Sequence, residues 1–240
     1  MQITNIIPFD IETAPDENAV LANTDKFDES SVKLGNIKDP EKIEAKIGDA
    51  KAKYWTNVFS KAALNPYTST ICAIGMALPD EDKVRILQGD EKVILTAFWS
   101  YFREFKNDIW VCYTGSNKKS MFDLRHILVR SWITRVSVPV GVVGNTGFIT
   151  SSFVDLANIF LAAADYPEYC GLDRACKLLG IVGEETRLGK VVSKESLEKD
   201  FGVSGANFHE LQYTQPEVAE VYLKNDVLMT LALSDRLIHV

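Results

Sequence analysis

Hydrophobic and polar positions alternate in several short stretches of the chain, a pattern that is typical of β-strands. The first stretch, residues 2–11, includes Ile7, Phe9 and Ile11 among its apolar positions. Three further strands are predicted at residues 70–78, 83–87 and 108–113. The turn-forming sequence PDED between the first two of these predicts a hairpin.

Elsewhere apolar residues recur every three or four positions, which predicts helices. The longest such pattern, residues 216–239, begins with Pro216, a residue suited to the first helical turn. Shorter helices are expected at residues 92–105, 119–132, 155–164 and 172–179. An early hairpin, then alternating strands and helices, then a helical C-terminal half indicate an α/β fold around a mixed sheet.

Residues 14–65 are mostly polar and charged. Within them, residues 41–55 follow Pro40 and carry Ile43, Ile47 and Tyr54 at helical spacing, so one amphipathic helix is expected. This segment offers too little apolar surface to fold alone. We therefore interpret residues 1–240 as one domain with a polar, helical insertion at about 14–65.

Composition limits the class of protein but does not select a function. The chain has 240 residues, 46% of them hydrophobic, and a formal net charge of −7. That charge excludes a general cationic field, so a nucleic acid would have to be bound locally. No run of about 18 apolar residues and no secretory leader occurs, so we expect a cytoplasmic protein with no membrane partner. The four cysteines lack zinc-ligand spacing, and three lie in apolar or strand-like stretches, where we expect buried thiols.

The candidate chemistry begins in the first strand, with the sequence FDIET. Residues two apart on a strand point to the same face, so Asp10 and Glu12 should project side by side. Adjacent carboxylates repel each other unless a cation lies between them, and Mg²⁺ and Mn²⁺ prefer oxygen ligands. The alternative is an ordinary solvent-exposed strand end.

Two later segments supply further candidate residues. Asn117, Phe122 and Asp123 follow the strand at residues 108–113. Asp123 falls in the first turns of the next helix, where its negative charge could simply stabilise the helix N-terminus. Tyr222 and Asp226 lie four apart on the last helix and so share a face. Each segment alone also fits an ordinary surface.

Taken together and in this order, the three segments resemble the DEDD superfamily of 3′–5′ exonucleases, in its tyrosine-containing (DEDDy) branch. The similarity is to the exonuclease domains of family B DNA polymerases and their stand-alone, phage-like relatives. Residues 172–192 also resemble the segment that links the last two motifs in those proteins. The resemblance implies a ribonuclease H-like fold, with a central mixed five-stranded sheet flanked by helices.

Two features depart from the family pattern. The insertion at residues 14–65 is longer than the usual link after the first motif, although residues 35–47 resemble some phage-type members. Ser116 stands where an aromatic residue commonly precedes the asparagine of the second motif. The four acids and the tyrosine are all present, so the resemblance implies an active enzyme.

The resemblance also implies a two-metal-ion mechanism with Mg²⁺ or Mn²⁺. Asp10, Glu12 and Asp226 would bind the first ion, with Asp10 bridging to a second ion near Asp123. Tyr222 would orient the attacking water. Asn117, Phe122 and Thr13 would contact the 3′ end of single-stranded DNA or RNA, and a separate DNA polymerase is a possible partner.

Several other residues were candidates for binding or catalysis. The basic residues near the second motif fit phosphate contacts or a solvated helix face: Lys118, Lys119, Arg125, His126 and Arg130. We expect a structural role for Asp155, and ordinary polar roles for His209 and His239. Competing interpretations are an exoribonuclease, a non-catalytic binding module and a haloacid dehalogenase-type phosphatase, whose second Asp and later acid pair are missing here.

Overall fold

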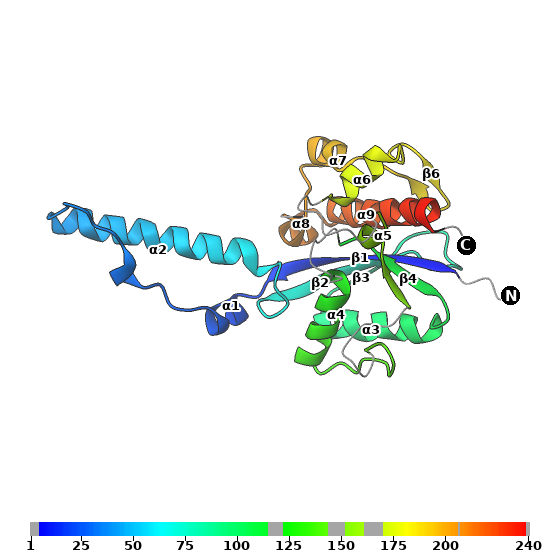
Figure 1. The fold of residues 1–240 in the computed structure, drawn as a ribbon, viewed down its shortest axis with the longest axis horizontal. Coiled ribbons are helices and arrows are strands. Elements are labelled where there is room, and N and C mark those ends of the chain that lie inside the picture. The colour runs from blue at the N-terminus through cyan, green and yellow to red at the C-terminus, as the bar shows by residue number, and fades with distance from the viewer. Residues whose placement is uncertain (1–4, 115–121, 144–151, 161–169, 206, 239–240) are drawn as a thin grey trace. The chain divides into compact units, whose positions relative to one another are not determined.

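The computed structural model describes residues 5–114, 122–143, 152–160, 170–205 and 207–238. Contacts divide the chain into two compact units. The first consists of Met1–Glu12 and Ile71–Val240 and contains most of the central sheet (Figure 1). The second is Thr13–Thr70, which includes the predicted insertion.

A mixed five-stranded sheet is the framework of the first unit. Its strands lie in the order β3-β2-β1-β4-β5. They are β1 (Ile6–Pro15), β2 (Ser69–Met76), β3 (Arg85–Gln88), β4 (Ile109–Cys112) and β5 (Phe153–Asp155). β4 pairs in parallel with both β1 and β5, whereas β2 and β3 are antiparallel. The expected α/β fold with a mixed five-stranded sheet is confirmed.

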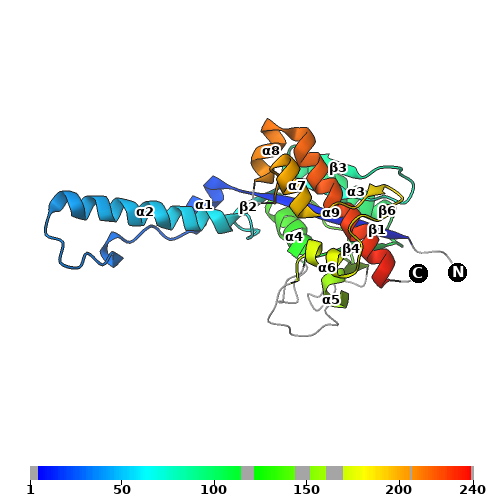
Figure 2. The same ribbon diagram turned by 90° about the horizontal axis from the view of Figure 1, so that it is seen from above.

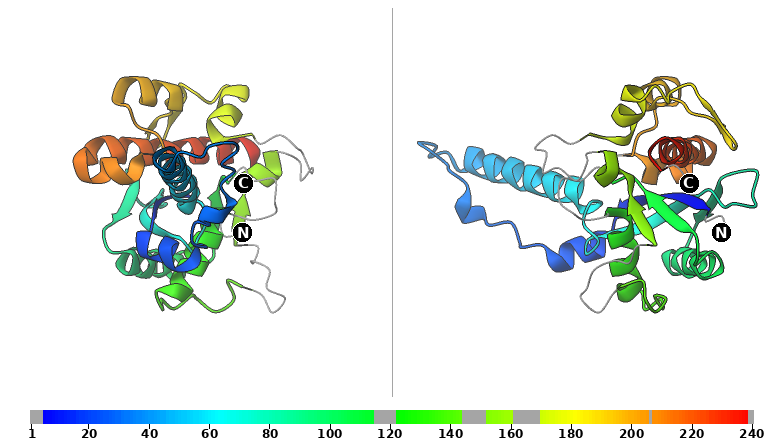
Figure 3. Two further views of the ribbon diagram at one scale, coloured as in Figure 1. Left: turned by 90° about the vertical axis from the view of Figure 1, so that its left-hand side faces the viewer. Right: turned by 45° about the vertical axis from the view of Figure 1, so that its right-hand side comes forward.

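Helices cover both faces of this sheet. The helices of the first unit are α3 (Glu91–Glu104), α4 (Phe122–Ile133), α5 (Leu156–Phe160), α6 (Leu172–Leu178), α7 (Lys194–Phe201), α8 (Phe208–Thr214) and α9 (Pro216–Leu237). A short hairpin of β6 (Glu185–Thr186) and β7 (Gly189–Lys190) lies beside them. Figure 3 shows α9 nearly end-on above the sheet, with α3 below it. α6 and α7 pack against α9 (Figure 2).

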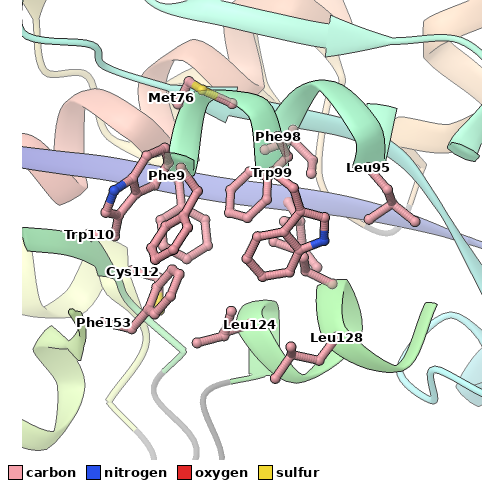
Figure 4. Packing of buried hydrophobic residues seen from close by; sticks show 14 of the residues in the cluster. Phe9, Met76, Leu95, Phe98, Trp99, Trp110, Cys112, Leu124, Leu128 and Phe153 are labelled. Carbon is pink, nitrogen blue, oxygen red and sulfur yellow. The ribbon is translucent and has the colours of Figure 1, made fainter. Parts of the chain in front are cut away.

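The face covered by α3 and α4 contains an aromatic core. Phe9 of β1 meets Phe98 of α3 with ring centroids 5.6 Å apart, and Phe102 stacks on Phe153 of β5 at 4.9 Å. Figure 4 shows the rings of Phe9, Phe98 and Phe153 together with those of Trp99 and Trp110. Large aromatic side chains exclude water well, so this cluster fixes the strands against α3.

An ion pair fixes α4 to the same framework. Arg130 donates from Nε and Nη2 to the two carboxylate oxygens of Glu91 at 2.8 and 2.7 Å. The backbone N–H of Ile71 donates to Glu91 as well, at 2.7 Å. Glu91 therefore joins α3, α4 and β2, and both charges of the pair are buried with hydrogen-bond partners.

The opposite face of the sheet packs against α9. Alternation along β1 directs Ile7, Phe9 and Ile11 into the aromatic core and leaves the intervening positions for the α9 side. Gly75 of β2 lies under α9, so close that an added Cβ would lie 2.8 Å from Val227 Cγ2. The glycine thus permits a close approach of the helix that carries Tyr222 and Asp226.

The second unit consists of α1 (Glu17–Asn23), a 3₁₀ turn η1 (Glu29–Ser31) and α2 (Pro40–Ala62). The segment before α2 runs back along this helix (Figure 2). Tyr54 donates its hydroxyl hydrogen to the carbonyl of Asp25 at 2.6 Å, and its ring lies 5.5 Å from that of Phe27. These contacts cover part of the apolar stripe of α2.

The predicted boundaries that differ most from the structure are the end of β1 and the end of α2. β1 runs to Pro15 rather than ending at residue 11, because Asp16 still donates its N–H to Thr68 and so prolongs the pairing. Asp10 and Glu12 accordingly lie within the strand. The helix predicted to end at residue 55 continues to Ala62, since Val58 and Ala62 extend its spacing of apolar residues.

Short elements were not predicted, namely α1, β5, the β6–β7 hairpin, α7 and α8. β5 has three residues and depends on its parallel pairing with β4, which no local pattern can reveal. No helix in the described part of the chain is long and apolar enough to cross a membrane.

Substitution of Gly75 by alanine tests the close packing of α9. The new methyl group would lie 2.8 Å from Val227 Cγ2 and 3.0 Å from Leu223 Cγ, inside a packed core. We expect Gly75→Ala to lower the free energy of unfolding by about 1–3 kcal/mol, measured by urea denaturation.

Gly48→Ala is the matched control. Gly48 lies in α2, and an added Cβ would meet no atom within 4 Å. Alanine is a better helix former, so this change should stabilise the second unit by about 0.5–1 kcal/mol. Equal stability of Gly75→Ala and the wild-type chain would contradict the packing described.

Candidate metal centre

Three carboxylates from β1 and α9 meet at one point. Asp10 and Glu12 point to the same side of β1, and Asp226 projects from α9 above that strand. One carboxylate oxygen of each lies within 4.8 Å of the other two. Glu12 is 7% exposed and Asp226 3%, so the acidic triad of Asp10, Glu12 and Asp226 is largely shielded from water.

The pKa values of these carboxyl groups show the cost of that arrangement. Burial, followed by the charge of Asp226, raises the pKa of Asp10 to about 8. Burial and then Asp10 raise the pKa of Glu12 well above its ordinary value. Burial also raises the pKa of Asp226, although a nearby lysine opposes the shift. Without added positive charge, the triad resists full ionisation.

Lys194 supplies one positive charge to the triad. Its Nζ donates to Asp226 Oδ2 at 2.6 Å and to the hydroxyl oxygen of Tyr222 at 3.0 Å. It also lies 4.8 Å from the centre of the Tyr222 ring. Burial alone would lower the pKa of Lys194, but Asp226 and Tyr222 raise it well above its ordinary value. The lysine is therefore charged beside the triad.

Lys194 was missed in the sequence, although a local signal was present. It is the first residue of α7, whose N-cap Ser193 accepts a hydrogen bond from Ser196 N–H, and Gly202 ends the helix with φ +69°. A serine cap and a terminal glycine are recognisable helix signals. They predict α7 but not the distant acid that its lysine meets.

Asn225 explains why α7 reaches the triad. Its side-chain oxygen accepts from Val192 N–H and its amide donates to Val192 C=O, both at 2.9 Å. This pair of bonds ties the segment before α7 to α9, next to Asp226 in sequence. The position of Lys194 thus follows from the same helix that carries its partner.

Tyr222 lies one helical turn before Asp226 and is buried. Burial, followed by the charge of Asp226, raises its pKa, so the hydroxyl remains protonated near neutral pH. A Cβ on Gly205 would lie 3.3 Å from this hydroxyl oxygen, so the chain passes close by. The hydroxyl is suited to orienting a neighbour rather than removing its proton.

Asp123 lies in the first turn of α4, as predicted, and is 4% exposed. Burial and then the charge of Asp10 raise its pKa well above the ordinary value. It is not part of the triad that meets within 4.8 Å. Asp10 therefore interacts electrostatically with the other two members of the triad and with Asp123.

Unpartnered oxygen atoms indicate that a cation fits this site. In the described part of the chain, Asp226 Oδ1 and Asp123 Oδ2 are buried and accept no hydrogen bond. An orphaned buried carboxylate oxygen is costly unless a cation or donor meets it. An all-oxygen donor set suits a hard divalent ion such as Mg²⁺ or Mn²⁺.

The three residues expected to contact substrate have different surroundings. Phe122 is half-buried, with its ring 4.1 Å from that of His126. Thr13 donates its hydroxyl hydrogen to the carbonyl of Ala63 at 2.7 Å. Asn117 lies outside the described residues. Their contact with a substrate stays a prediction.

The remaining basic candidates differ in exposure. Arg125 is exposed, whereas Lys118 and Lys119 lie outside the described residues. His126 is buried and its pKa falls to about 4, mainly through burial. Arg130 is buried on Glu91. For His126 and Arg130, the predictions of a phosphate contact and of a solvated helix face are therefore both wrong, because the two side chains are buried.

The other minor predictions concern structural residues. Asp155 accepts hydrogen bonds from the N–H groups of Thr114 and Ala157 at 3.2 and 3.0 Å, which confirms its structural role. The four cysteines are buried free thiols, whereas the sequence predicted burial for three of them. His209 is half-buried in α8, and His239 lies outside the described residues.

Comparison with known proteins identifies a similar fold. No family model and no curated protein matches the chain. Among solved structures, the family B DNA polymerase from the hyperthermophilic archaeon Pyrobaculum calidifontis is similar, with a TM-score of 0.55 and 17% identity. The match covers 97% of this chain but 24% of that one, so the chain spans about a quarter of the polymerase. At this identity the similarity shows the fold, which is consistent with a ribonuclease H-like architecture.

The raised carboxyl pKa values predict a pH-dependent stability in EDTA. The pKa of Asp10 is about 8 in the folded chain, against an ordinary value of 3.8. Between these values the folded state retains a proton that the unfolded state releases, so the free energy of unfolding falls as pH rises. Asp10→Asn has no such proton. We expect the wild-type chain to lose ~2–4 kcal/mol more than this variant between about pH 5 and pH 8, measured by urea denaturation.

Asp200→Asn controls for the loss of one negative charge. Asp200 is exposed near the end of α7, and its variant should follow the wild-type pH profile. Added Mn²⁺ should restore stability at about pH 8 to the wild-type chain and to Asp200→Asn, but much less to Asp10→Asn. An Asp10→Asn profile that parallels the wild-type profile would contradict the assigned electrostatics.

Proposed function

We propose that the chain is a metal-dependent 3′–5′ exonuclease that hydrolyses phosphodiester bonds at the 3′ end of a single strand, by a two-metal-ion mechanism. The observation that carries the proposal is the buried triad of Asp10, Glu12 and Asp226, whose oxygens lie within 4.8 Å of one another. The fold shared with part of a family B DNA polymerase and the motif resemblance to DEDDy exonucleases support it.

Binding of divalent ions would rest on carboxylates from three elements. Asp10, Glu12 and Asp226 would bind one ion, and Asp10 with Asp123 would bind the second. Bound ions would stabilise charge on the attacked phosphate and make the attacking water more acidic. Because the carboxyl pKa values are raised, metal binding must displace protons and should strengthen as pH rises.

Lys194 and Tyr222 would position the water that attacks the phosphate. The Tyr222 hydroxyl, protonated near neutral pH, can accept from Lys194 while donating its own hydrogen to a water. Lys194 also offsets the charge of Asp226. Together they would orient the attacking water without removing its proton themselves.

The proposed substrate is a single-stranded 3′ end, with DNA preferred to RNA on the polymerase-like fold. Phe122 would contribute an aromatic surface near a terminal base, and Asn117 and Thr13 polar contacts. A DNA polymerase acting in trans would be a partner that consumes the trimmed end. The protein would act in the cytoplasm.

A nuclease assay tests the proposal. Wild-type protein with 5′-labelled single-stranded DNA and Mg²⁺ or Mn²⁺ should yield products shortened from the 3′ end, and EDTA should abolish them. We expect Asp10→Asn and Asp226→Asn to lower the rate by about 100-fold or more, since each removes a charged metal ligand. A parallel RNA substrate measures the sugar preference.

Asp200→Asn again provides the control, because its carboxylate is exposed outside the triad. It should cleave at the wild-type rate. Labelled DNA and RNA that both remain intact with either ion, or an activity that Asp10→Asn leaves unchanged, would refute the proposed function.

A further inference from the structure

The second unit contains a basic helix face in an otherwise acidic chain. α2 carries five lysines, and the chain as a whole has a net charge of −7. From Ala50 to Thr70 there is no acidic residue, whereas Lys51, Lys53 and Lys61 occur in this stretch. Such a separation of charge makes this part of α2 locally positive.

Helical geometry gathers most of these lysines on one side. Lys42, Lys46 and Lys53 are four and seven positions apart, which places them within about 40° on the helix, and Lys61 follows at its end. Asn57 and Ser60 lie between them, and Asp49 is the one acid on this side. We call Lys42, Lys46, Lys53 and Lys61 the lysine face. It extends for roughly 28 Å along α2.

The lysine face is available for binding. Its residues are all exposed. Lys42 makes one long ion pair with Asp39, at 3.8 Å. Lys46, Lys53 and Lys61 have no acidic partner within 4 Å among the described residues. Their charges therefore remain to be neutralised by a ligand or by salt.

The surroundings of α2 favour one type of polyanion. A helix that binds a membrane inserts a free apolar face beside its lysines. In α2 that face is partly covered, because Tyr54 bonds to Asp25 and packs on Phe27. Flexible lysine side chains are suited instead to bind a row of phosphates independently of the nucleotide sequence.

We propose that the lysine face binds the phosphate backbone of single-stranded nucleic acid. The inference rests on the proposed exonuclease function, since it assigns to the second unit a contact with the single-stranded substrate. The acidic triad repels a polyanion when no divalent ion is bound, so binding in EDTA reports on the lysine face rather than on the catalytic centre.

The test uses the full chain, EDTA and a labelled 30-nucleotide single-stranded DNA, with binding measured by fluorescence anisotropy at several salt concentrations. We expect Lys46→Gln/Lys53→Gln/Lys61→Gln to weaken binding about 10- to 100-fold near 0.1 M salt. The slope of log affinity against log salt should become smaller by about 2, as three lost phosphate contacts require. Glutamine is a good helix former, so α2 should retain its helicity, checked by circular dichroism.

The control variant is Lys92→Gln/Lys106→Gln/Lys199→Gln, which removes three exposed lysines from the first unit. It should bind the DNA nearly as the wild-type chain does. An equal loss in the two triple variants, no loss in either, or no wild-type binding in EDTA would overturn the inference. So would attachment to anionic phosphatidylglycerol vesicles through the same lysines without any binding of DNA.

Cleavage assays separate this inference from the proposed function. With Mg²⁺, the lysine-face variant should need more of a long substrate to reach half-maximal rate but keep its maximal rate, and it should cleave a trinucleotide normally. If no metal cofactor supports cleavage while EDTA binding still depends on the lysine face, the nuclease proposal fails and this inference stands. If the lysine-face variant cleaves DNA normally and binds it with unchanged affinity, the nuclease proposal stands and this inference fails.

Discussion

Asp10, Glu12 and Asp226 lie close together in a site that is largely shielded from water, so their negative charges repel one another with little screening. Folding alone does not relieve this repulsion. Lys194 neutralises one charge of the group, and protons must neutralise others near neutral pH unless a divalent ion is present. Burial, followed by this repulsion, therefore accounts for the raised pKa values of Asp10 and Glu12. Together with the orphaned carboxylate oxygens, it favours a cation of high charge.

Packing on both faces of the sheet holds the three carboxylates of the triad close together despite their repulsion. Phe9 and the rings of α3 fix β1 from below, while Gly75 lets α9 approach from above. Asn225 then ties the start of α7 to α9, which brings Lys194 to its partner. A destabilising site is thus supported by rigid packing elsewhere, which is a common property of functional centres.

Sequence periodicity was sufficient for the larger part of the fold. The alternation in FDIET predicts that Asp10 and Glu12 share a face, and the four-residue spacing of Tyr222 and Asp226 predicts theirs, because both depend on local geometry. Their convergence could be expected only from a resemblance. Lys194 could not be found, since its partner is 32 residues away and the contact depends on tertiary packing. The burial of Arg130 could not be predicted either, because its partner Glu91 lies on another helix.

Anomalous diffraction from crystals grown with Mn²⁺ would show whether the triad binds a divalent cation. We expect a manganese peak within bonding distance of oxygens from Asp10, Glu12 and Asp226, at about 2.0–2.3 Å, and loss of that peak in Asp226→Asn crystals. If well-diffracting Mn²⁺ crystals show no peak at the triad and Lys194 still contacts Asp226, the triad is not a divalent-cation site.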